Sequence, residues 1–465
     1  MRFTKNYLDN IKILDGILSP SKSFDMIKRR LKIGKSEATF YYIDGLVKDE
    51  TMLKLMQIFT DMKQLPSDAK DFIAGNVPHV EVETTFDVDK AVLLVMSGGV
   101  CMVGDTFGSD AVLIDARTYP VRSVAEPESD RVMRGARDGF VETLIFNTAL
   151  IRRRIRDTRL RIVYKNIGSM SKTDIAIVYV EGVADEKYVK WLSDKLDTIK
   201  TDCIPMGHES LAECLIQKKW YNPFPKIRST ERPDTASAQL AEGSVIILCD
   251  TSPEAMILPT CIFDFLQETG DYYFSPLTGT YLRIVRHAIF WLTIFLVPLW
   301  YLLVHNPSYL PEWLKFVVPN DFGALPLIVQ LLLVEFVIDG LKLASMNTPS
   351  MLTNSLSVVG GLILGDFAVN IGWLIPEVIL YMAFVAIANF TQASYQLGYA
   401  VKFMRMLLLV TTALFGVYGF IFGCVLILTL IATNKTVNGG RSYLYPLIPF
   451  NGKALMRLLF RVKKK

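Results

Sequence analysis

The chain lacks the features by which most enzymes, nucleic-acid binders and disulfide-stabilised proteins are recognised. It has only four histidines in 465 residues, and it contains no phosphate loop, dinucleotide fingerprint or nucleophile elbow. The net charge of +4 is too small to indicate a polyanionic partner. The six cysteines are irregularly spaced, which argues against a disulfide framework. We therefore expect no enzymatic activity, no catalytic residues, no cofactor and no nucleic-acid partner.

The sequence also indicates neither a metal site nor a signal peptide. Cys203, His208 and Cys214 are the nearest candidate ligands, but their spacing fits no zinc pattern and a fourth ligand is missing. The N-terminus, MRFTKNYLDNIKILDG, has neither a long apolar core nor a small-residue cleavage site. We therefore expect no bound metal, and we expect the N-terminal part to remain in the cytoplasm.

Charge is distributed unevenly along the chain. Residues 1–286 carry charges throughout, whereas charges are sparse from His287 to Ala432. From Thr433 to the end the chain has eight Lys and Arg residues and no acid. The apolar part predicts an all-α membrane domain of four or five membrane segments. Its candidate segments are 288–304, 325–346, 355–374, 374–390 and 406–432.

The number of spans depends on where the basic tail lies. A tail with only positive charge favours the cytoplasm, the side expected for the N-terminal part. Four spans satisfy this condition if the glycine-rich region at 360–366 does not cross, and five spans remain an alternative. The predicted domains are 1–125, the segment 126–161, 162–283, the membrane domain 284–434 and the tail 435–465.

The soluble part contains an internal repeat. KSEATFYYIDGLVKDETMLKLM, from Lys35, matches KTDIAIVYVEGVADEKYVKWL, from Lys172, in the order strand, acid-glycine turn and helix. We also expect a second buried strand in each copy, KAVLLVM at Lys90 and GSVIILC at Gly243. The sequence therefore predicts two similar α/β subdomains.

Between the two copies lies a segment, 126–161, with nine arginines and six acids. Its apolar residues recur at roughly helical spacing, so we expect a long arginine-rich helix that joins the subdomains. A solvated, salt-bridged connector is one interpretation, and an inter-subunit or inter-domain contact built from arginine–carboxylate pairs is the other. The residues expected to make such contacts are Glu126, Glu128, Arg134, Arg137, Asp138, Arg152, Arg153 and Arg154.

Acidic residues inside the membrane domain raise a functional question. Glu335 and Asp339 are four residues apart on one helix face, and Asp366 lies in a run of small residues. An ionisable group in a span costs about 2.5–3.5 kcal/mol on insertion scales, and such groups often mark an ion path. The alternative is structural pairing, of Asp339 with Lys342 or of Glu335 with a neighbouring subunit. The candidates for an ion path are Glu335, Asp339, Ser355, Ser357, Gly360, Gly361, Gly365 and Asp366.

Several motifs resemble one known family. PESDRVMRGARDGF followed by ETLIFNTALIRRRIRD resembles the signature of bacterial spore germination proteins, the A subunits of GerA-type germinant receptors. VVGGLILGDFAV is similar to the GG-x-x-x-G membrane motif of that family, although Asp366 stands where relatives often have Gln. The C-terminal SYLYPLIPFNGKALMRLLFR is most similar to the SpoVAF branch.

The resemblance implies a location and an assembly. It implies a multi-pass protein of the spore inner membrane, with a two-part cytosolic domain in the spore core. It also implies a homo-oligomeric ring, expected to be a pentamer, that conducts monovalent cations during germination. The implied partners are membrane lipid and either a small membrane subunit or the receptor B and C subunits. A signal-transducing scaffold without conductance is the alternative, and a secondary transporter is less favoured because no inverted repeat is evident.

Overall fold

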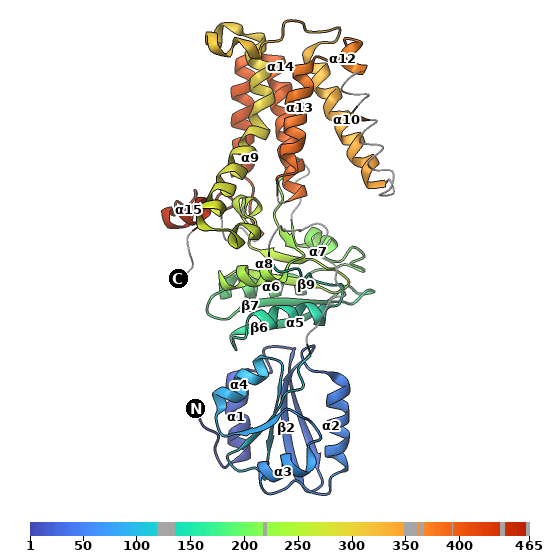
Figure 1. Ribbon diagram of the computed structural model, residues 1–465, viewed down its shortest axis with the longest axis vertical. Helices are drawn as coiled ribbons and strands as arrows, with labels where there is room; N and C mark the ends of the chain where they lie inside the picture. Colours follow the sequence, from blue (N-terminus) through green and yellow to red (C-terminus); the bar gives the residue numbers. More distant parts are fainter. Residues whose placement is uncertain are drawn as a thin grey trace. The chain divides into compact units, whose positions relative to one another are not determined.

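The structure is a computed structural model that describes residues 1–118, 135–216, 221–347, 360–361, 367–392, 394–437 and 442–461. The chain divides into two compact units. The first comprises Met1–Gln217 and Ile227–Thr260, and the second comprises Lys218–Lys226 and Cys261–Lys465. The first unit is built from two sheets covered by helices, and the second is helical (Figure 1).

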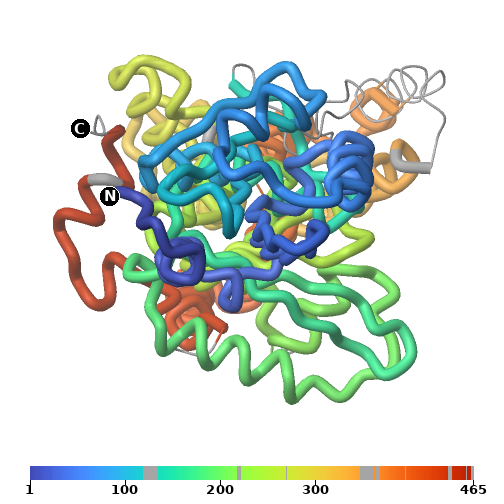
Figure 2. The backbone as a smooth tube through the Cα atoms, turned by 90° about the horizontal axis from the view of Figure 1, so that it is seen from below, coloured from blue at the N-terminus to red at the C-terminus, as the bar shows by residue number. Residues whose placement is uncertain are grey.

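The first unit begins with a lobe formed by residues 1–118, blue in Figures 1 and 2. Its elements are α1 (Tyr7–Leu18), β1 (Met26–Ile33), β2 (Ser36–Ile43), α2 (Asp49–Asp61), α3 (Ala69–Asn76), β3 (Val82–Thr85), α4 (Val88–Met96), β4 (Val100–Gly104) and β5 (Ala111–Ile114). The strands form one antiparallel sheet in the order β1-β2-β4-β5-β3.

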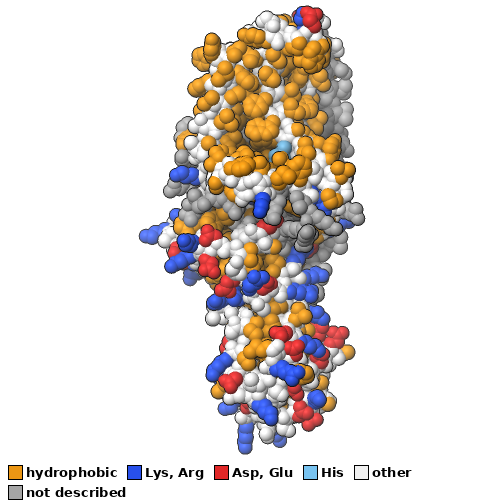
Figure 3. All heavy atoms as spheres, turned by 90° about the vertical axis from the view of Figure 1, so that its left-hand side faces the viewer, with side chains coloured by type: hydrophobic (Ala, Val, Ile, Leu, Met, Phe, Trp, Pro, Cys, Tyr) orange, Lys and Arg blue, Asp and Glu red, His pale blue; other side chains and the backbone are white. Residues whose placement is uncertain are grey.

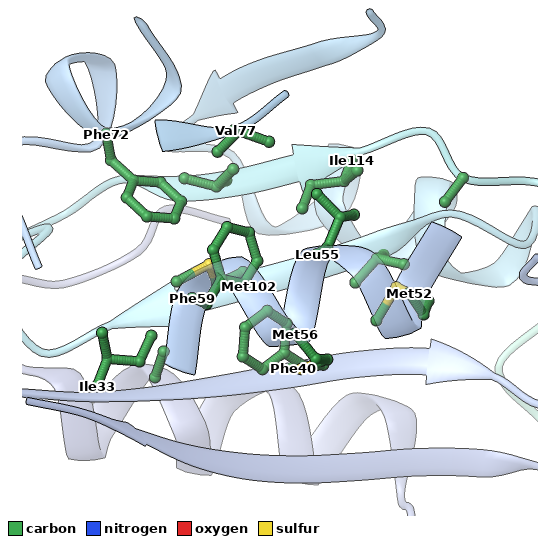
Figure 4. Packing of buried hydrophobic residues seen from close by; sticks show 14 of the residues in the cluster. Ile33, Phe40, Met52, Leu55, Met56, Phe59, Phe72, Val77, Met102 and Ile114 are labelled. Atoms are coloured by element: carbon green, nitrogen blue, oxygen red, sulfur yellow. The ribbon is translucent and has the colours of Figure 1, made fainter. Parts of the chain in front are cut away.

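Side chains that alternate along the strands place an apolar core on each face of this sheet. Phe40 of β2 points to the face covered by α2 and α3, where it stacks on Phe59 at a ring-centroid distance of 5.9 Å (Figure 4). The next residue, Tyr41, points to the other face, where it packs with Leu14 of α1 and Val95 of α4. Burial on both faces explains why the strand reads as nearly continuous bulky residues.

The second lobe repeats this plan. Its elements are α5 (Leu144–Arg154), β6 (Leu160–Ile167), β7 (Thr173–Val180), α6 (Glu186–Asp197), α7 (His208–Leu215), β8 (Arg228–Thr230), α8 (Pro233–Ala241), β9 (Val245–Cys249) and β10 (Ala255–Leu258). The strand order, β6-β7-β9-β10-β8, is that of the first sheet element for element. The predicted repeat is confirmed, down to the acid-glycine turns, in which Gly45 and Gly182 both have φ of 77°.

One predicted strand is wrong. The run KAVLLVM at Lys90 belongs to the helix α4, whose N-terminus is capped by the side chain of Asp87. The equivalent of β9 is β4, which starts at Val100. A short apolar run does not by itself distinguish a helix from a strand. The signal that favoured a helix here was Asp87, because an aspartate just before such a run is typical of a helix N-cap.

The long helix expected over 126–161 is also wrong. Residues 126–134 lie outside the described part of the chain, and of 135–161 only Leu144–Arg154 is helical. This helix, α5, is the counterpart of α1. Its Leu150 and Ile151 pack against the second sheet, whereas Ala149 lies in the core of the first lobe. A helix continued to Arg161 would remove the start of β6 from its pairing with β7.

The second unit contains the apolar helices. Its elements are η1 (Ile262–Leu266), η2 (Thr269–Tyr273), α9 (Pro276–His305), η3 (Pro307–Tyr309), η4 (Glu312–Val317), α10 (Leu327–Asn347), α12 (Ala368–Asn370), α13 (Pro376–Asn389), α14 (Tyr395–Ala432) and α15 (Gly452–Leu459). Within the described residues, α9 and α14 are long and apolar enough to cross a membrane. Hydrophobic side chains dominate the face of this unit that Figure 3 shows. Membrane-spanning helices have this length and composition.

The segment expected to be a single span at 406–432 is not one straight helix. Gly416 within α14 has φ of 59° and ψ of −133°, which reverses the direction of the chain. A Cβ added to Gly419 would lie 1.9 Å from the carbonyl oxygen of Thr411, and one added to Gly423 would lie 2.6 Å from Leu408. In a straight helix, residues 411 and 419 would be about 12 Å apart. The two halves, 395–415 and 417–432, therefore fold back on each other.

A candidate charged site in the helical unit

Four charged side chains meet between two helices of the second unit. Glu335 and Asp339 project from α10 one turn apart, and Lys402 and Arg405 project from α14 at a spacing of three. Residues at these spacings share one helix face, so two acids oppose two bases. We call these four residues the charged cluster.

The centre of the charged cluster is the pair formed by Glu335 and Arg405. Arg405 Nη2 donates to both carboxylate oxygens of Glu335, at 2.8 and 2.7 Å. Its Nη1 donates to the backbone carbonyl of Thr293 in α9, at 3.4 Å. Both side chains are buried, with Glu335 7% and Arg405 4% exposed. This arginine thereby links three helices.

Lys402 joins the second acid to the cluster. Its Nζ donates to Asp339 Oδ2 and lies 3.7 Å from Glu335 Oε1. The side chain of Asp339 remains 30% exposed, and within the described residues its Oδ1 has no hydrogen-bond partner. Asp339 is therefore the member of the cluster that has unused ligand capacity.

The electrostatics of the cluster follow from its composition. Two carboxylates and two cationic groups sum to zero, so each charge is compensated locally. Removal of one partner from a buried pair leaves an uncompensated charge, which typically costs about 3–5 kcal/mol. This cost applies to the buried pair of Glu335 and Arg405, whereas Asp339, with 30% of its side chain exposed, loses less when it is changed.

The structure brings together some of the predicted ion-path residues. Glu335 and Asp339 lie in the charged cluster, and a Cβ added to Gly360 would lie 2.9 Å from Leu341 of α10. Apart from its chain neighbours, a Cβ added to the adjacent Gly361 would lie more than 4 Å from every atom of the described residues. The alternative pairing of Asp339 with Lys342 is wrong, because Asp339 pairs with Lys402. Ser355, Ser357, Gly365 and Asp366 lie outside the described residues.

Sequence reasoning missed the two bases. Lys402 and Arg405 lie just before the apolar run that starts at Met406, and they were not considered as partners of the two acids. The signal was their spacing of three, which matches one face of a helix and complements the two acids of 325–346.

The predicted arginine contacts form a second charged region, between the two lobes of the first unit. Arg152 of α5 donates to both oxygens of Asp25, at distances from 2.9 to 3.1 Å, and to the carbonyl of Leu160 at 3.0 Å. Arg152 and Asp25 each have only 1% of the side chain exposed. The backbone N–H of Phe24 also donates to Ile162, at 3.1 Å. Arg152 therefore fastens the first lobe to the second within one chain.

A neighbouring triad extends this interface toward solvent. Arg161 Nη2 lies 2.6 Å from Glu181 Oε2, and Lys22 Nζ lies 3.1 Å from Glu181 Oε1. These hydrogen bonds, from Arg161 first and Lys22 second, lower the pKa of Glu181. Glu181 belongs to the acid-glycine turn of the second copy, so the repeat itself supplies an acid to the interface.

The remaining predicted contact residues are placed as follows. Arg154 Nη2 donates to both oxygens of Asp138 at 2.6 Å, which ties α5 to the extended segment before it. Arg137 and Arg153 are exposed. Glu126, Glu128 and Arg134 lie outside the described residues.

Comparison with known proteins finds relatives over the whole chain. Residues 13–465 match the family model described as Bacillus/Clostridium GerA spore germination protein. Stage V sporulation protein AF of Bacillus subtilis is 37% identical over 468 residues, which cover 100% of this chain and 94% of the relative. Spore germination protein KA of the same organism is 29% identical over 95% of this chain and 82% of its own length. GerLA of Bacillus cereus is 30% identical over 80% of this chain and 75% of its own length.

Among solved structures, one match is the N-terminal domain of the A subunit of the Bacillus megaterium germinant receptor GerK3. It is 23% identical, with a TM-score of 0.41, and the match covers 55% of this chain and 96% of that domain.

Proposed function

The chain belongs to the Bacillus/Clostridium GerA family of spore germination proteins, and we propose that its copies assemble into a ring that conducts cations across the spore membrane. Its relatives include proteins of sporulation and of spore germination. The proposed ring is a pentamer in the spore inner membrane, crossed several times by each chain, with the two lobes in the spore core. A small membrane subunit, or the B and C subunits of a germinant receptor, completes the complex.

The charged cluster is the observation that carries this proposal. Uncompensated charge is costly between apolar helices, so four ionisable groups there need a role. Both carboxylate oxygens of Glu335 accept hydrogen bonds from Arg405, and this pair holds α10 against α14. The side chain of Asp339 is partly exposed, and its Oδ1, which is itself buried, has no hydrogen-bond partner in the described structure, so Asp339 is the better candidate for a group that meets a cation when the helices move.

Lys402 suggests how such a path is kept closed. In the arrangement described, its ammonium group neutralises Asp339, and the local charge offered to a cation is zero. A movement that separates α14 from α10 would leave the carboxylate uncompensated and attractive to a cation. Because the pair joins two different helices, a signal that shifts either helix changes the charge of the path.

Ion flux from liposomes tests the proposal. The full chain, purified with its membrane partner subunits, is reconstituted with trapped K⁺. We expect efflux from the wild type and severalfold slower efflux from Asp339→Asn, because this change leaves Lys402 positive and repels cations. Glu312→Gln is the matched control: it removes a carboxylate of the same unit that also pairs with one lysine, Lys315, but is 91% exposed.

A compensating variant separates charge from structural damage. Asp339→Asn combined with Lys402→Met restores local neutrality, so efflux should rise above that of Asp339→Asn but stay below the wild type, because no carboxylate remains at position 339 to attract a cation. If the efflux rate of Asp339→Asn equals that of the wild type, Asp339 does not contribute to the ion path. A correctly assembled complex that shows no efflux at all would instead favour the scaffold without conductance.

A further inference from the structure

The C-terminal segment of the second unit exposes apolar and basic side chains together. Exposed apolar residues precede, lie within and follow α15: Leu447, Ile448, Phe450, Met456 and Phe460 are between 42% and 75% exposed. Lys453 is exposed on the same helix at a spacing of three from Met456, so these two residues share one face, and Phe460 follows the end of the helix. Leu458, on the opposite face, is only 5% exposed. The helix therefore buries one apolar side in the protein and presents a second one outward.

The charged residues of this segment are all basic. From Thr433 to Lys465 the chain has eight Lys and Arg residues and no Asp or Glu. A basic segment with bulky apolar side chains on its exposed face is typical of helices that lie in the headgroup region of an anionic bilayer.

Contacts with α9 set the position of α15 along the helical unit. The backbone N–H of Arg461 donates to Thr280 Oγ1 at 3.1 Å, and its guanidinium donates to the carbonyls of Tyr272 and Phe274. Arg283 Nη1 donates to the carbonyl of Leu458 at 3.5 Å. Gly279 allows this approach, because a Cβ there would lie 2.8 Å from the Arg461 side chain. The end of α15 is therefore fixed beside residues 279–283.

That position corresponds to the edge of a bilayer. The uncharged run of α9 starts at Ala288, only five residues after Arg283, or about 8 Å along the helix. The thirty residues of α9 extend about 45 Å, which exceeds a hydrocarbon core of about 30 Å. Tyr272, Tyr273 and Tyr281, between 37% and 64% exposed, lie around this end of α9, as tyrosines do at membrane interfaces. Figure 1 shows α15 beside the lower end of α9.

We propose that residues 444–461 form an interfacial anchor whose exposed apolar face lies among the headgroups of an anionic phospholipid bilayer. Phe450, Met456 and Phe460 enter the boundary with the acyl chains, and Lys453 contacts lipid phosphate. The anchor holds the cytosolic end of α9 at a fixed depth. This inference requires that the protein lies in a membrane, and it does not depend on conduction.

Photo-crosslinking tests which partner contacts this face. Benzoylphenylalanine replaces Phe450 in the full chain, which is placed in nanodiscs of phosphatidylcholine and phosphatidylglycerol in equal amounts. The same replacement of Phe422, 59% exposed in α14, is the positive control for lipid, and replacement of Val80, 98% exposed in the first unit, is the negative control. We expect the mass of one phospholipid added at position 450. A protein adduct, or no adduct while position 422 reacts with lipid, would overturn the proposal.

The headgroup preference tests the role of charge. We expect phosphatidylglycerol to exceed phosphatidylcholine severalfold among adducts at position 450, and to equal it at position 422. Lys453→Gln should lower the ratio at position 450 toward that of position 422. A ratio that does not change would show that apolar contact alone places this face.

Discussion

Arg152→Met provides the sharpest test of how the two lobes are joined. The change removes a guanidinium that satisfies both oxygens of Asp25 and the carbonyl of Leu160, and it leaves a carboxylate with 1% exposure without its cationic partner. Breaking a buried pair in this way typically costs about 3–5 kcal/mol. Hydrogen exchange of the intact protein measures this cost locally, because protection reports the free energy of opening.

At about 1.36 kcal/mol for each factor of ten, amides of β6 should exchange roughly 150- to 5,000-fold faster in Arg152→Met. Arg159→Met is the matched control, since Arg159 pairs with Asp157 at the surface with 58% of its side chain exposed, where pairs contribute about 0.2–1 kcal/mol. The double variant Asp25→Leu/Arg152→Met removes both charges and should recover more than half of the loss. Equal exchange of β6 in Arg152→Met and Arg159→Met would refute the reasoning.

Two further predictions concern other parts of the chain. Gly419→Ala should lower the thermal stability of the detergent-purified protein because its Cβ would meet the Thr411 carbonyl at 1.9 Å. Gly340→Ala, whose Cβ would meet no atom of the described residues within 4 Å, should be neutral or stabilising by up to about 1 kcal/mol. Equal melting temperatures of the two variants would contradict the folding back of 395–415 on 417–432. Burial alone lowers the pKa of His208, but the hydrogen bond and charge of Glu254, whose Oε2 lies 3.2 Å away, raise it overall. The stability that this pair contributes is therefore fully present below a pH of about 6.5, and it is lost as the pH rises through the raised pKa of His208. Hydrogen exchange of the α7 amides, corrected for intrinsic rates, should therefore increase from pH 6 to pH 8 in the wild type. The increase should be smaller in His208→Gln.

The lobes were predictable because their repeat is local in sequence. A strand, an acid-glycine turn and a helix recur together, and only glycine readily adopts the positive φ found at Gly45 and Gly182. The family resemblance, carried by the arginine-rich motif, is confirmed by the match over residues 13–465. In contrast, the sequence did not reveal that α5 is short, because its end is set by pairing of β6 with β7, a contact between distant residues.

In the charged cluster, the two acids were predictable from the sequence and the two bases were not. The cost of Glu335 and Asp339 in an apolar segment is visible in the sequence, but their partners lie more than 60 residues away on α14. The reversal at Gly416 was also missed, since one glycine in a long apolar run usually remains helical. The recurrence of glycine at 416, 419 and 423 was the available signal, because close approach of two helix backbones favours residues without a side chain.

The bond between Arg461 and Thr280 has a topological consequence. It joins the last described residue of the chain to the second turn of the first long apolar helix, so in a bilayer these two groups lie on the same side. Any traversals of a bilayer between those two points must come in pairs. An odd total would separate the two bonded groups by the whole thickness of the lipid.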